Sequence, residues 1–248
     1  KTDEQSWDYK ENLFNYALDL DGNNFFRSSF TPNSLFSSTN PTTLQLRFKT
    51  PGIPKTHLSQ SIFNIGDSSL LTIEYTGSSY TSGSHLGSIV DPYNEYGTIK
   101  YTPDISSPNV YASAYLPIFD GGWWSVMTTT TTDASLTVAN SIDNEIGFIE
   151  HSSIAGINNT PYNNSTKILI PSDQNISFSS KTYTPLSGSI QEIRYYSSNI
   201  NTSSFKDFTL NPLSIKGTGN STSEELIFRA DLGSLSSISN RNSIHPKV

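Results

Sequence analysis

The sequence predicts an all-β protein in which two antiparallel sheets pack face to face. Three observations lead to this fold class. Short runs of alternating apolar and polar residues recur along the chain, and prolines and other turn residues separate them. Aromatic residues make up 12% of the chain and hydrophobic residues 34%, so rings must supply much of the core volume. Helical periodicity is almost absent.

Four runs carry the clearest strand pattern: "TLQLRFK", "LLTIEYT", "GTIKYTP" and "SLTVAN". Successive side chains on a strand point to opposite faces, so each run is predicted to show one face to the core and the other to solvent. The residues predicted to face the core are Leu44, Leu46, Phe48, Leu71, Ile73, Tyr75, Ile99, Tyr101, Leu136 and Val138. The residues predicted to face solvent are Gln45, Arg47, Lys49, Thr72, Glu74, Thr98, Lys100, Thr102 and Thr137.

The run "SGSIQEIRYY" is predicted to be the closing strand, although its alternation is imperfect. Ile190 falls on the opposite face from Ile193 and Tyr195, which implies either a β-bulge or burial on both faces. Glu192 and Arg194 share a face, and we expect them to form an exposed structural ion pair.

One short helical turn is predicted near residues 203–208, directly after this strand. Ser204 is the candidate N-cap, with Asp207 three residues later as in a weak capping box. Elsewhere the many Ser, Asn and β-branched residues make helices costly.

The chain is predicted to contain one domain between a lead-in and an extension. Two long polar connections, 76–96 and 150–167, are expected to be functional or inserted. The run "EELIFRADLG" is either an added edge strand or the start of a further domain. Because residue 1 is not Met and the chain stops abruptly at "NSIHPKV", we expect a fragment of a longer protein with neighbouring domains. The predicted division is 1–13 for the lead-in, 14–210 for the sandwich domain and 211–248 for the extension.

Composition excludes several classes of function. The net charge of −7 and the lack of a basic stripe argue against nucleic acid as a partner. The chain has no Cys, so disulfides, thiol chemistry and Cys-based metal sites are excluded. No apolar run reaches the roughly 18 residues that a membrane span needs.

Read in order, the landmarks resemble a laminin G-like, concanavalin A-like jelly roll over Leu18 to Leu210. The segments that carry the resemblance are "LDLDGNNFFRSS", "TTLQLRFKT", "QSIFNIGDSSLLTIEY", "GTIKY", "GGWWSVMTTTTTDASLTVAN" and "LSGSIQEIRYYSSNINTSSF". Asn140 and Ser141 stand where the family usually has an Asp-Gly turn. The resemblance implies a two-sheet jelly-roll sandwich with a short helix after its last strand, and a lectin-like recognition function.

A second resemblance connects "DGGWW", "NPLSI" and "SIHPKV" with virion structural proteins of large algal or marine viruses and phages. It implies a location on a virion or on an extracellular surface.

The adjacent tryptophans are the first candidate for ligand binding, because an exposed ring can pack against a sugar. Only one of the two can face the core; the resemblance places Trp124 inside and Trp123 outside. The alternative is that a loop or partner covers Trp123. A Tyr-rich loop is the second candidate, and its alternative is that the tyrosines pack on one another. The candidate ligand-binding residues are Trp123, Tyr80, His85, Asp91, Tyr93, Asn94 and Tyr96.

Calcium is the one cofactor that the resemblance implies, with Asp67, Asp91 and Asp120 as candidate ligands. The alternative is that these residues make Asx turns. An EF-hand at "DLDGN" is excluded, because Phe30 stands at the twelfth position, where a bidentate Glu is required.

Three functions remain in consideration. The first is a non-catalytic lectin-like recognition or adhesion module that binds a glycan or a protein surface through loops. The second is a structural assembly module of a viral particle without a glycan site. The third is a glycoside hydrolase, which needs paired carboxylates across one bond. In "DNEIGFIE", Asp143 and Glu145 share a face but Glu150 falls on the other, so we predict that the protein is not an enzyme.

Overall fold

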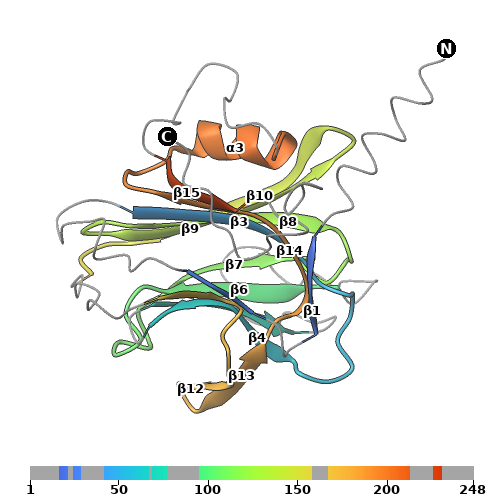
Figure 1. Cartoon of the computed structure of the whole chain (residues 1–248), viewed down its shortest axis with the longest axis vertical. Coiled ribbons are helices and arrows are strands. Elements are labelled where there is room, and N and C mark those ends of the chain that lie inside the picture. Colours follow the sequence, from blue (N-terminus) through green and yellow to red (C-terminus); the bar gives the residue numbers. More distant parts are fainter. Residues whose placement is uncertain are drawn as a thin grey trace.

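The fold is a sandwich of two antiparallel sheets, and the predicted fold class is confirmed (Figure 1). The computed structural model describes residues 17–21, 25–28, 42–66, 69–76, 95–157, 167–212 and 226–230. The only parallel pairing among the described strands is a short one between β13 and β4. The division into lead-in, domain and extension stays a prediction, because most of 1–13 and 211–248 lies outside these ranges.

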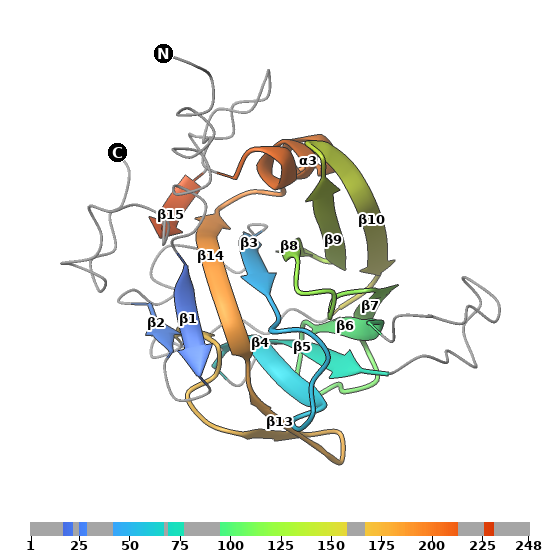
Figure 2. The same ribbon diagram turned by 90° about the vertical axis from the view of Figure 1, so that its right-hand side faces the viewer.

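The front sheet has seven described strands in the order β1-β14-β3-β8-β9-β10, with β15 also paired to β14. β1 pairs with the first half of β14 and β15 with its second half, so the two short strands share one edge (Figure 2). The strands are β1 (Leu18–Asp21), β3 (Thr42–Lys49), β8 (Trp123–Thr130), β9 (Ala134–Ile142), β10 (Glu145–Ile154), β14 (Ser187–Tyr196) and β15 (Leu226–Ala230).

The back sheet has eight described strands in the order β12-β13-β4-β5-β6-β7, and β11 joins β4 and β2. The strands are β2 (Phe26–Arg27), β4 (Ser59–Ile65), β5 (Ser69–Tyr75), β6 (Gly97–Thr102), β7 (Ala112–Leu116), β11 (Ile168–Ile170), β12 (Ile176–Phe178) and β13 (Lys181–Pro185).

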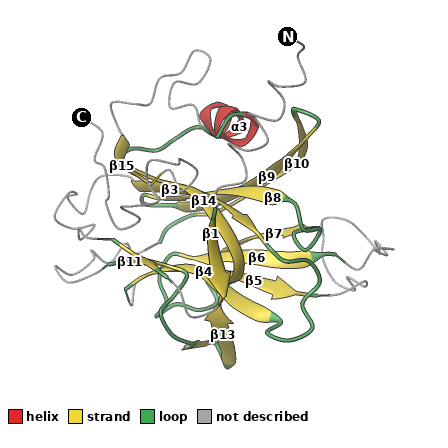
Figure 3. Cartoon of the chain, turned by 45° about the vertical axis from the view of Figure 1, so that its right-hand side comes forward, coloured by secondary structure: helices red, strands yellow, loops and turns green. Residues whose placement is uncertain are grey.

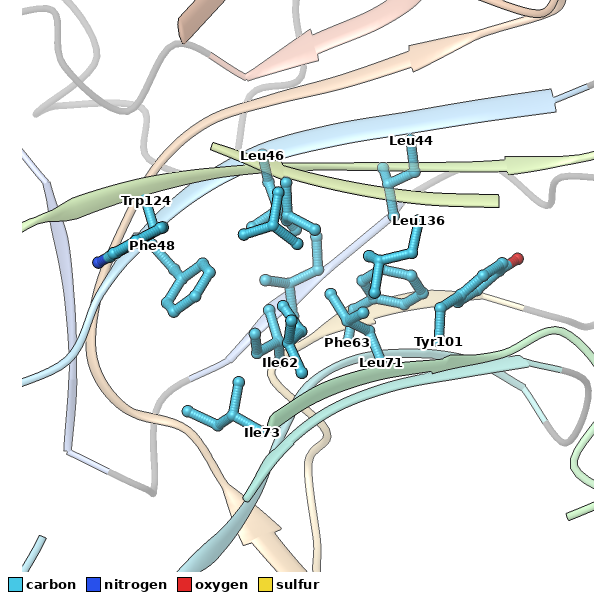
Figure 4. Packing of buried hydrophobic residues seen from close by; sticks show 14 of the residues in the cluster. Leu44, Leu46, Phe48, Ile62, Phe63, Leu71, Ile73, Tyr101, Trp124 and Leu136 are labelled. Atoms are coloured by element: carbon cyan, nitrogen blue, oxygen red, sulfur yellow. The ribbon is translucent and has the colours of Figure 1, made fainter. Parts of the chain in front are cut away.

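The core lies between the two sheets and is built of rings and branched aliphatic side chains (Figure 4). Every residue that the alternation assigned to the core belongs to this cluster, with Tyr75 partly buried at its margin. Trp124 is the largest side chain in it and is fully buried. The period-2 pattern therefore predicted the inward face of each strand correctly.

The prediction that the opposite face of each strand meets solvent is wrong for many residues. Gln45, Arg47 and Thr137 on the front sheet are buried, and so are Thr72 and Glu74 on the back sheet. One cause is the helix α3 (Thr202–Leu210), which lies across the outer face of the front sheet (Figure 3). It packs there in a second apolar cluster, made of Met127, Ala139, Tyr196, Ile200, Phe205, Phe208 and Leu226.

Helix α3 is the predicted short helix, but its N-cap is Asn201 and not Ser204. The Asn201 side-chain oxygen accepts a hydrogen bond from the Ser204 backbone N–H at 2.8 Å. Ser204 is thus the third residue of the helix, and the cap lies three residues earlier than predicted. Asn is among the best N-cap residues, so the sequence allowed either choice.

The predicted bulge in the closing strand is present. The register between β14 and β3 shifts between Gln191 and Arg194, and Glu192 within the shift has φ of 47°. The Glu192–Arg194 ion pair forms at 3.2 Å, but both side chains are buried, so its predicted exposure is wrong. Arg229 of β15 also pairs with Glu192, and Arg194 donates to the Pro212 carbonyl.

The turn after β9 lies farther along the chain than the resemblance implied. Asn140 and Ser141 belong to β9 itself, and the turn is made by Asp143 and Asn144, with φ of 52° and 64°. Two consecutive left-handed residues match the right-handed twist of a hairpin. The second long connection is also shorter than predicted, because β10 continues to Ile154.

Candidate functional site

The outer face of the front sheet presents polar side chains and one indole on four neighbouring strands. Asp19 on β1 is the register partner of Ser189 on β14, and Ser189 is the partner of Lys49 on β3. Lys49 is in turn the partner of Trp123, the first residue of β8. Asp19 is exposed and the other three are half-buried, so we name these residues the exposed row. Neighbouring strands lie about 4.8 Å apart, so the row is about 14 Å long.

A second row lies two residues farther along the same strands. Gln191, Arg47 and Ser125 are register partners across β14, β3 and β8. Their exposed fractions are 4%, 7% and 1%, so we name them the buried row. Strand geometry places the two rows about 7 Å apart on one face.

Trp123 and Trp124 divide between the two faces as the alternation predicts. Trp124 is fully buried, and its indole Nε1 donates a hydrogen bond to Asp120 Oδ1 at 3.0 Å. Trp123 is half-buried on the outer face, where the Arg47 guanidinium lies 5.3 Å from the centre of its ring. This cation–π contact covers one face of the Trp123 ring and fixes its orientation.

The guanidinium of Arg47 is only partly satisfied. Its Nη1 donates to Gln191 Oε1 at 3.1 Å. In the described part of the chain, Arg47 Nε and Ser125 Oγ have no hydrogen-bond partner although both are buried. Burial lowers the pKa of Arg47 to about 10, against the opposing effect of the Glu192 charge, so Arg47 stays cationic at neutral pH. The buried row therefore combines a positive charge with two unused hydrogen-bonding groups.

The buried polar atoms continue along β3 and β8 toward α3. Gln45 Nε2 contacts Met127 Sδ at 3.4 Å, while Gln45 Oε1 has no partner among the described residues. Thr129 Oγ1 is likewise unpartnered in this part of the chain. The outer face of the front sheet thus changes from half-buried at Trp123 to fully buried beneath α3, where an apolar cluster packs against the helix.

The structure brings three of the predicted site residues to the same end of the sandwich. Trp123 and Asp120 lie at the start of β8, and Tyr96 immediately precedes β6. The Phe119 N–H donates to the Glu95 carbonyl at 3.0 Å, which joins the two segments. The Tyr96 ring packs 4.9 Å from that of Tyr115. The remaining ligand-binding candidates, Tyr80, His85, Asp91, Tyr93 and Asn94, lie outside the described residues.

The predicted calcium ligands are tested only at Asp120. Its Oδ1 accepts hydrogen bonds from the Gly122 N–H at 2.7 Å and from Trp124, which is the Asx turn considered as the alternative. Asp67 and Asp91 are not described. β5 begins at Ser69, close to Asp67 in the chain, and ends at Tyr75, which pairs with Gly97. The start of β5 is therefore at the opposite end of the strand from Gly97 and Asp120. Among the described residues no group of three or more His, Asp or Glu side chains could hold a metal ion. Calcium binding stays a prediction.

The carboxylates considered for hydrolysis are not assembled into a pair. Asp143 lies in the two-residue turn, and Glu145 begins β10 with an exposed side chain. Glu150 Oε2 accepts a hydrogen bond from the Tyr115 N–H at 2.9 Å, so it joins β10 to the edge strand β7 of the other sheet. These positions favour structural roles.

Sequence reasoning missed most members of the two rows. Asp19, Ser189 and Gln191 lie far from Trp123 in the chain, and no motif connects them. The available signal was the polar set at alternate positions of the "TLQLRFK" run, which includes Arg47 and Lys49. That signal becomes informative only when the register between β3 and β8 is known, because pairing decides which polar residues meet the indole.

No protein-family model matches the chain, and no curated protein matches it. Solved structures match it at low identity. Tailspike protein 2 of an Escherichia coli O157:H7 bacteriophage is 13% identical, with a TM-score of 0.54 over 88% of this chain. A candidate carbohydrate-binding protein from Bacteroides ovatus is 14% identical, with a TM-score of 0.50 over 88% of this chain. The LG1–3 region of the laminin α2 chain is 14% identical, with a TM-score of 0.46 over 76% of this chain.

The likenesses to the tailspike protein and to the Bacteroides protein support the fold alone, a two-sheet jelly-roll sandwich. This chain spans 26% of the tailspike protein, 52% of the Bacteroides protein and 32% of the laminin region, so it corresponds to one part of each. In the part of the chain that the structure describes, α3 is the only helix, and it is too short and polar to cross a membrane.

Proposed function

We propose that this chain is a non-catalytic, lectin-like recognition module that binds a glycan on the exposed row of the front sheet. The observation that carries the proposal is the placement of Trp123 in line with Lys49, Ser189 and Asp19 on adjacent strands. An aromatic ring packs against the apolar face of a pyranose, and neighbouring polar groups bind its hydroxyls. The row contains both kinds of group.

The polar members offer donors and acceptors in one line. Ser189 Oγ donates to Asp19 Oδ1 at 2.7 Å, which orients the carboxylate beside β14. The other oxygen of Asp19 and the ammonium of Lys49 can then bind sugar hydroxyls on either side. Because Arg47 covers one face of the Trp123 ring, the sugar packs against the opposite face.

Placement on strands also favours binding. Side chains held by a sheet lose less freedom on association than side chains on loops, so less affinity is lost to ordering. The loop residues that the sequence singled out are then additional contacts and not the centre of the site.

A glycan array with the purified protein tests the proposal, with and without Ca²⁺ because calcium remains a candidate cofactor. We expect binding that is lost in Trp123→Ala. Tyr111→Ala is the matched control, since Lys100 lies 5.3 Å from the Tyr111 ring on the back sheet in the same kind of cation–π contact. Absence of any hit at millimolar glycan, or equal loss in both variants, would contradict the proposal.

A second candidate function is an assembly module of a virion or extracellular surface protein, built into a longer chain. It is favoured by exposed apolar side chains around the β9–β10 turn. Ile142, Phe148 and Ile149 are 51%, 39% and 38% exposed. Sedimentation velocity over a range of concentrations tests it. We expect self-association that Ile149→Asp abolishes, whereas a monomer at every concentration would remove this support.

A further inference from the structure

Arg47 differs from the other two arginines of the front sheet, the buried Arg194 and the half-buried Arg229. Arg194 and Arg229 both pair with the Glu192 carboxylate. Arg194 also donates to the Pro212 carbonyl, and its guanidinium lies over an aromatic ring of α3. Arg47, which is 7% exposed, makes no ion pair within the ranges that the structure describes.

Burying a cation without a carboxylate is costly, because the desolvated charge is not compensated. Glu192 is the acidic group whose charge reaches Arg47, but its two oxygens are occupied by the other two arginines. The chain therefore holds a positive charge at this place without supplying a neutralising partner of its own from the described residues.

The unused hydrogen-bonding groups lie beside this charge. Arg47 and Ser125 are register partners, so their Cβ atoms are about 5 Å apart on one face. Arg47 Nε and Ser125 Oγ have no partner in the described part of the chain. Both can donate to the same small group, and an anionic acceptor satisfies them best, since charge-assisted bonds to a guanidinium are the strongest available.

The exposed row provides the direction of approach. Lys49, two residues from Arg47 on β3, adds a second positive charge that is half exposed. The half-buried Trp123 stands between solvent and Arg47. The Trp123 ring lies between Arg47 and a sugar packed on its other face, so an acidic substituent of that sugar would reach the buried row beside the ring, past Lys49.

We infer that the ligand of the exposed row is an acidic glycan, whose carboxylate or sulfate group is bound by Arg47 and Ser125. The inference rests on the proposed function and specifies the chemical class of its ligand. Arg47 is then the residue that selects acidic over neutral sugars, and Lys49 reinforces the selection electrostatically.

The test compares acidic glycans with their neutral counterparts on the unmodified protein. The carboxylate pair is tetragalacturonic acid and its fully methyl-esterified form, and the sulfate pair is 3′-sulfolactose and lactose. These pairs accompany a glycan array that contains both acidic and neutral sugars. We expect the array hits to be acidic, and the acidic member of at least one pair to bind about tenfold more tightly than its neutral counterpart. Tighter binding in one pair only identifies the carboxylate or the sulfate as the recognised group.

Two variants assign the preference to Arg47. Arg47→Gln should bring the acidic and neutral members of the preferred pair to within about threefold of each other, and Arg47→Lys should retain part of the preference. Arg27→Gln, at an exposed position on β2, is the control for net charge and should keep the full preference.

The outcomes separate the two proposals. Binding of neutral glycans as tightly as acidic ones, or an acidic preference that survives Arg47→Gln, overturns the inference and leaves the glycan site in place. The absence of binding to any glycan overturns the proposed function and the inference together. The comparison of acidic with neutral ligands needs only the unmodified protein, so it decides whether the ligand is acidic even if the Arg47 variants do not fold.

Discussion

The two outer faces of the sandwich contain similar charged and aromatic residues, but the faces differ in how many of their polar groups have partners. Each face has a cation 5.3 Å from an aromatic ring, Arg47 at Trp123 on the front sheet and Lys100 at Tyr111 on the back sheet. On the back sheet Lys100 and Lys181 form ion pairs with Glu74. In the buried row of the front sheet, two described hydrogen-bonding atoms have no partner. The two faces thus differ in how completely their buried polar groups are paired.

The back-sheet network is internally satisfied. Glu74 accepts hydrogen bonds from Lys181 and Tyr183 at 2.7 Å each, and from Lys100 at 3.3 Å. Burial raises the pKa of the Glu74 carboxyl, but these bonds and the two lysine charges outweigh burial, so its pKa is lowered overall. Burial, together with the hydrogen bond to Glu74 and repulsion by its charge, raises the pKa of Tyr183. Such a network stabilises the fold, because each of its charged groups has a partner within the sheet.

The front-sheet face is less completely satisfied. Its polar atoms without a partner among the described residues, such as Arg47 Nε and Ser125 Oγ, reduce stability, and a ligand that supplied their partners would recover that free energy. Sites of this kind are expected to gain stability when their polar groups are removed, at the expense of function. The four predictions below test that contrast.

The largest effect is expected at Glu192, the closed part of the front-sheet face. Glu192→Gln leaves the buried Arg194 and the half-buried Arg229 without a carboxylate, and should lower the free energy of unfolding by about 3–5 kcal/mol. Urea denaturation measures it. Glu145→Gln, at an exposed position, is the control and should change stability by less than about 0.5 kcal/mol. Equal effects of the two would show that the ion cluster does not stabilise the fold.

Glu74→Gln should lower the free energy of unfolding by about 1–3 kcal/mol at neutral pH, because the amide offers Lys100, Lys181 and Tyr183 only one acceptor oxygen and no charge. The pKa of Glu74 is lowered in the folded state, so its contribution is present above the unfolded value of about 4.3 and is lost as pH falls through the folded value. The difference between the two proteins should therefore shrink at acidic pH. Urea titrations at several pH values measure it, and a difference that grew in acid would contradict the network.

Trp123→Ala should lower the free energy of unfolding by only about 1–2 kcal/mol, because the side chain is half-buried and loses one cation–π contact. Tyr111→Ala on the back sheet should have a similar effect on stability. Thermal unfolding followed by circular dichroism compares the two. A loss of about 3–5 kcal/mol in Trp123→Ala alone would place the indole in the core and remove the exposed row.

Arg47→Met is expected to leave stability unchanged or to raise it by about 1 kcal/mol, since it replaces an uncompensated buried charge with an apolar chain. The preference for acidic over neutral glycans should be lost in the same variant. A clear destabilisation in urea denaturation, similar to that of Glu74→Gln, would mean that Arg47 is as well satisfied as the back-sheet network and that the two faces do not differ.

Much of the fold could be read from the chain. Alternation in the four clearest runs assigned Leu46, Ile73 and Val138 to the core, and imperfect alternation announced the bulge around Glu192. The strands that the sequence did not predict had weaker alternation of apolar and polar residues. In β10 both faces are largely exposed, and β11 and β12 are three residues long, so period 2 leaves little signal.

The candidate site, like the fold, was partly predictable from the sequence. The opposite orientations of Trp123 and Trp124 followed from adjacency alone, because neighbouring residues on a strand cannot share a face. The partners of Trp123 did not follow, since Asp19, Ser189 and Lys49 reach it only through strand pairing between distant segments. The burial of Arg47 and of Glu192 was also beyond the sequence, because whether an outward face stays wet depends on what packs across it.

Local chemistry thus determined which side of each strand is apolar, where turns interrupt the strands and that a short helix follows the closing strand, because these depend on neighbours in the chain. Tertiary structure alone decided which outward polar residues are buried, which charges are paired and which are left unpaired. Those properties arise from the register of distant strands and from α3 lying across the front sheet, because the free energy of desolvating a given polar side chain depends on what surrounds it in the fold.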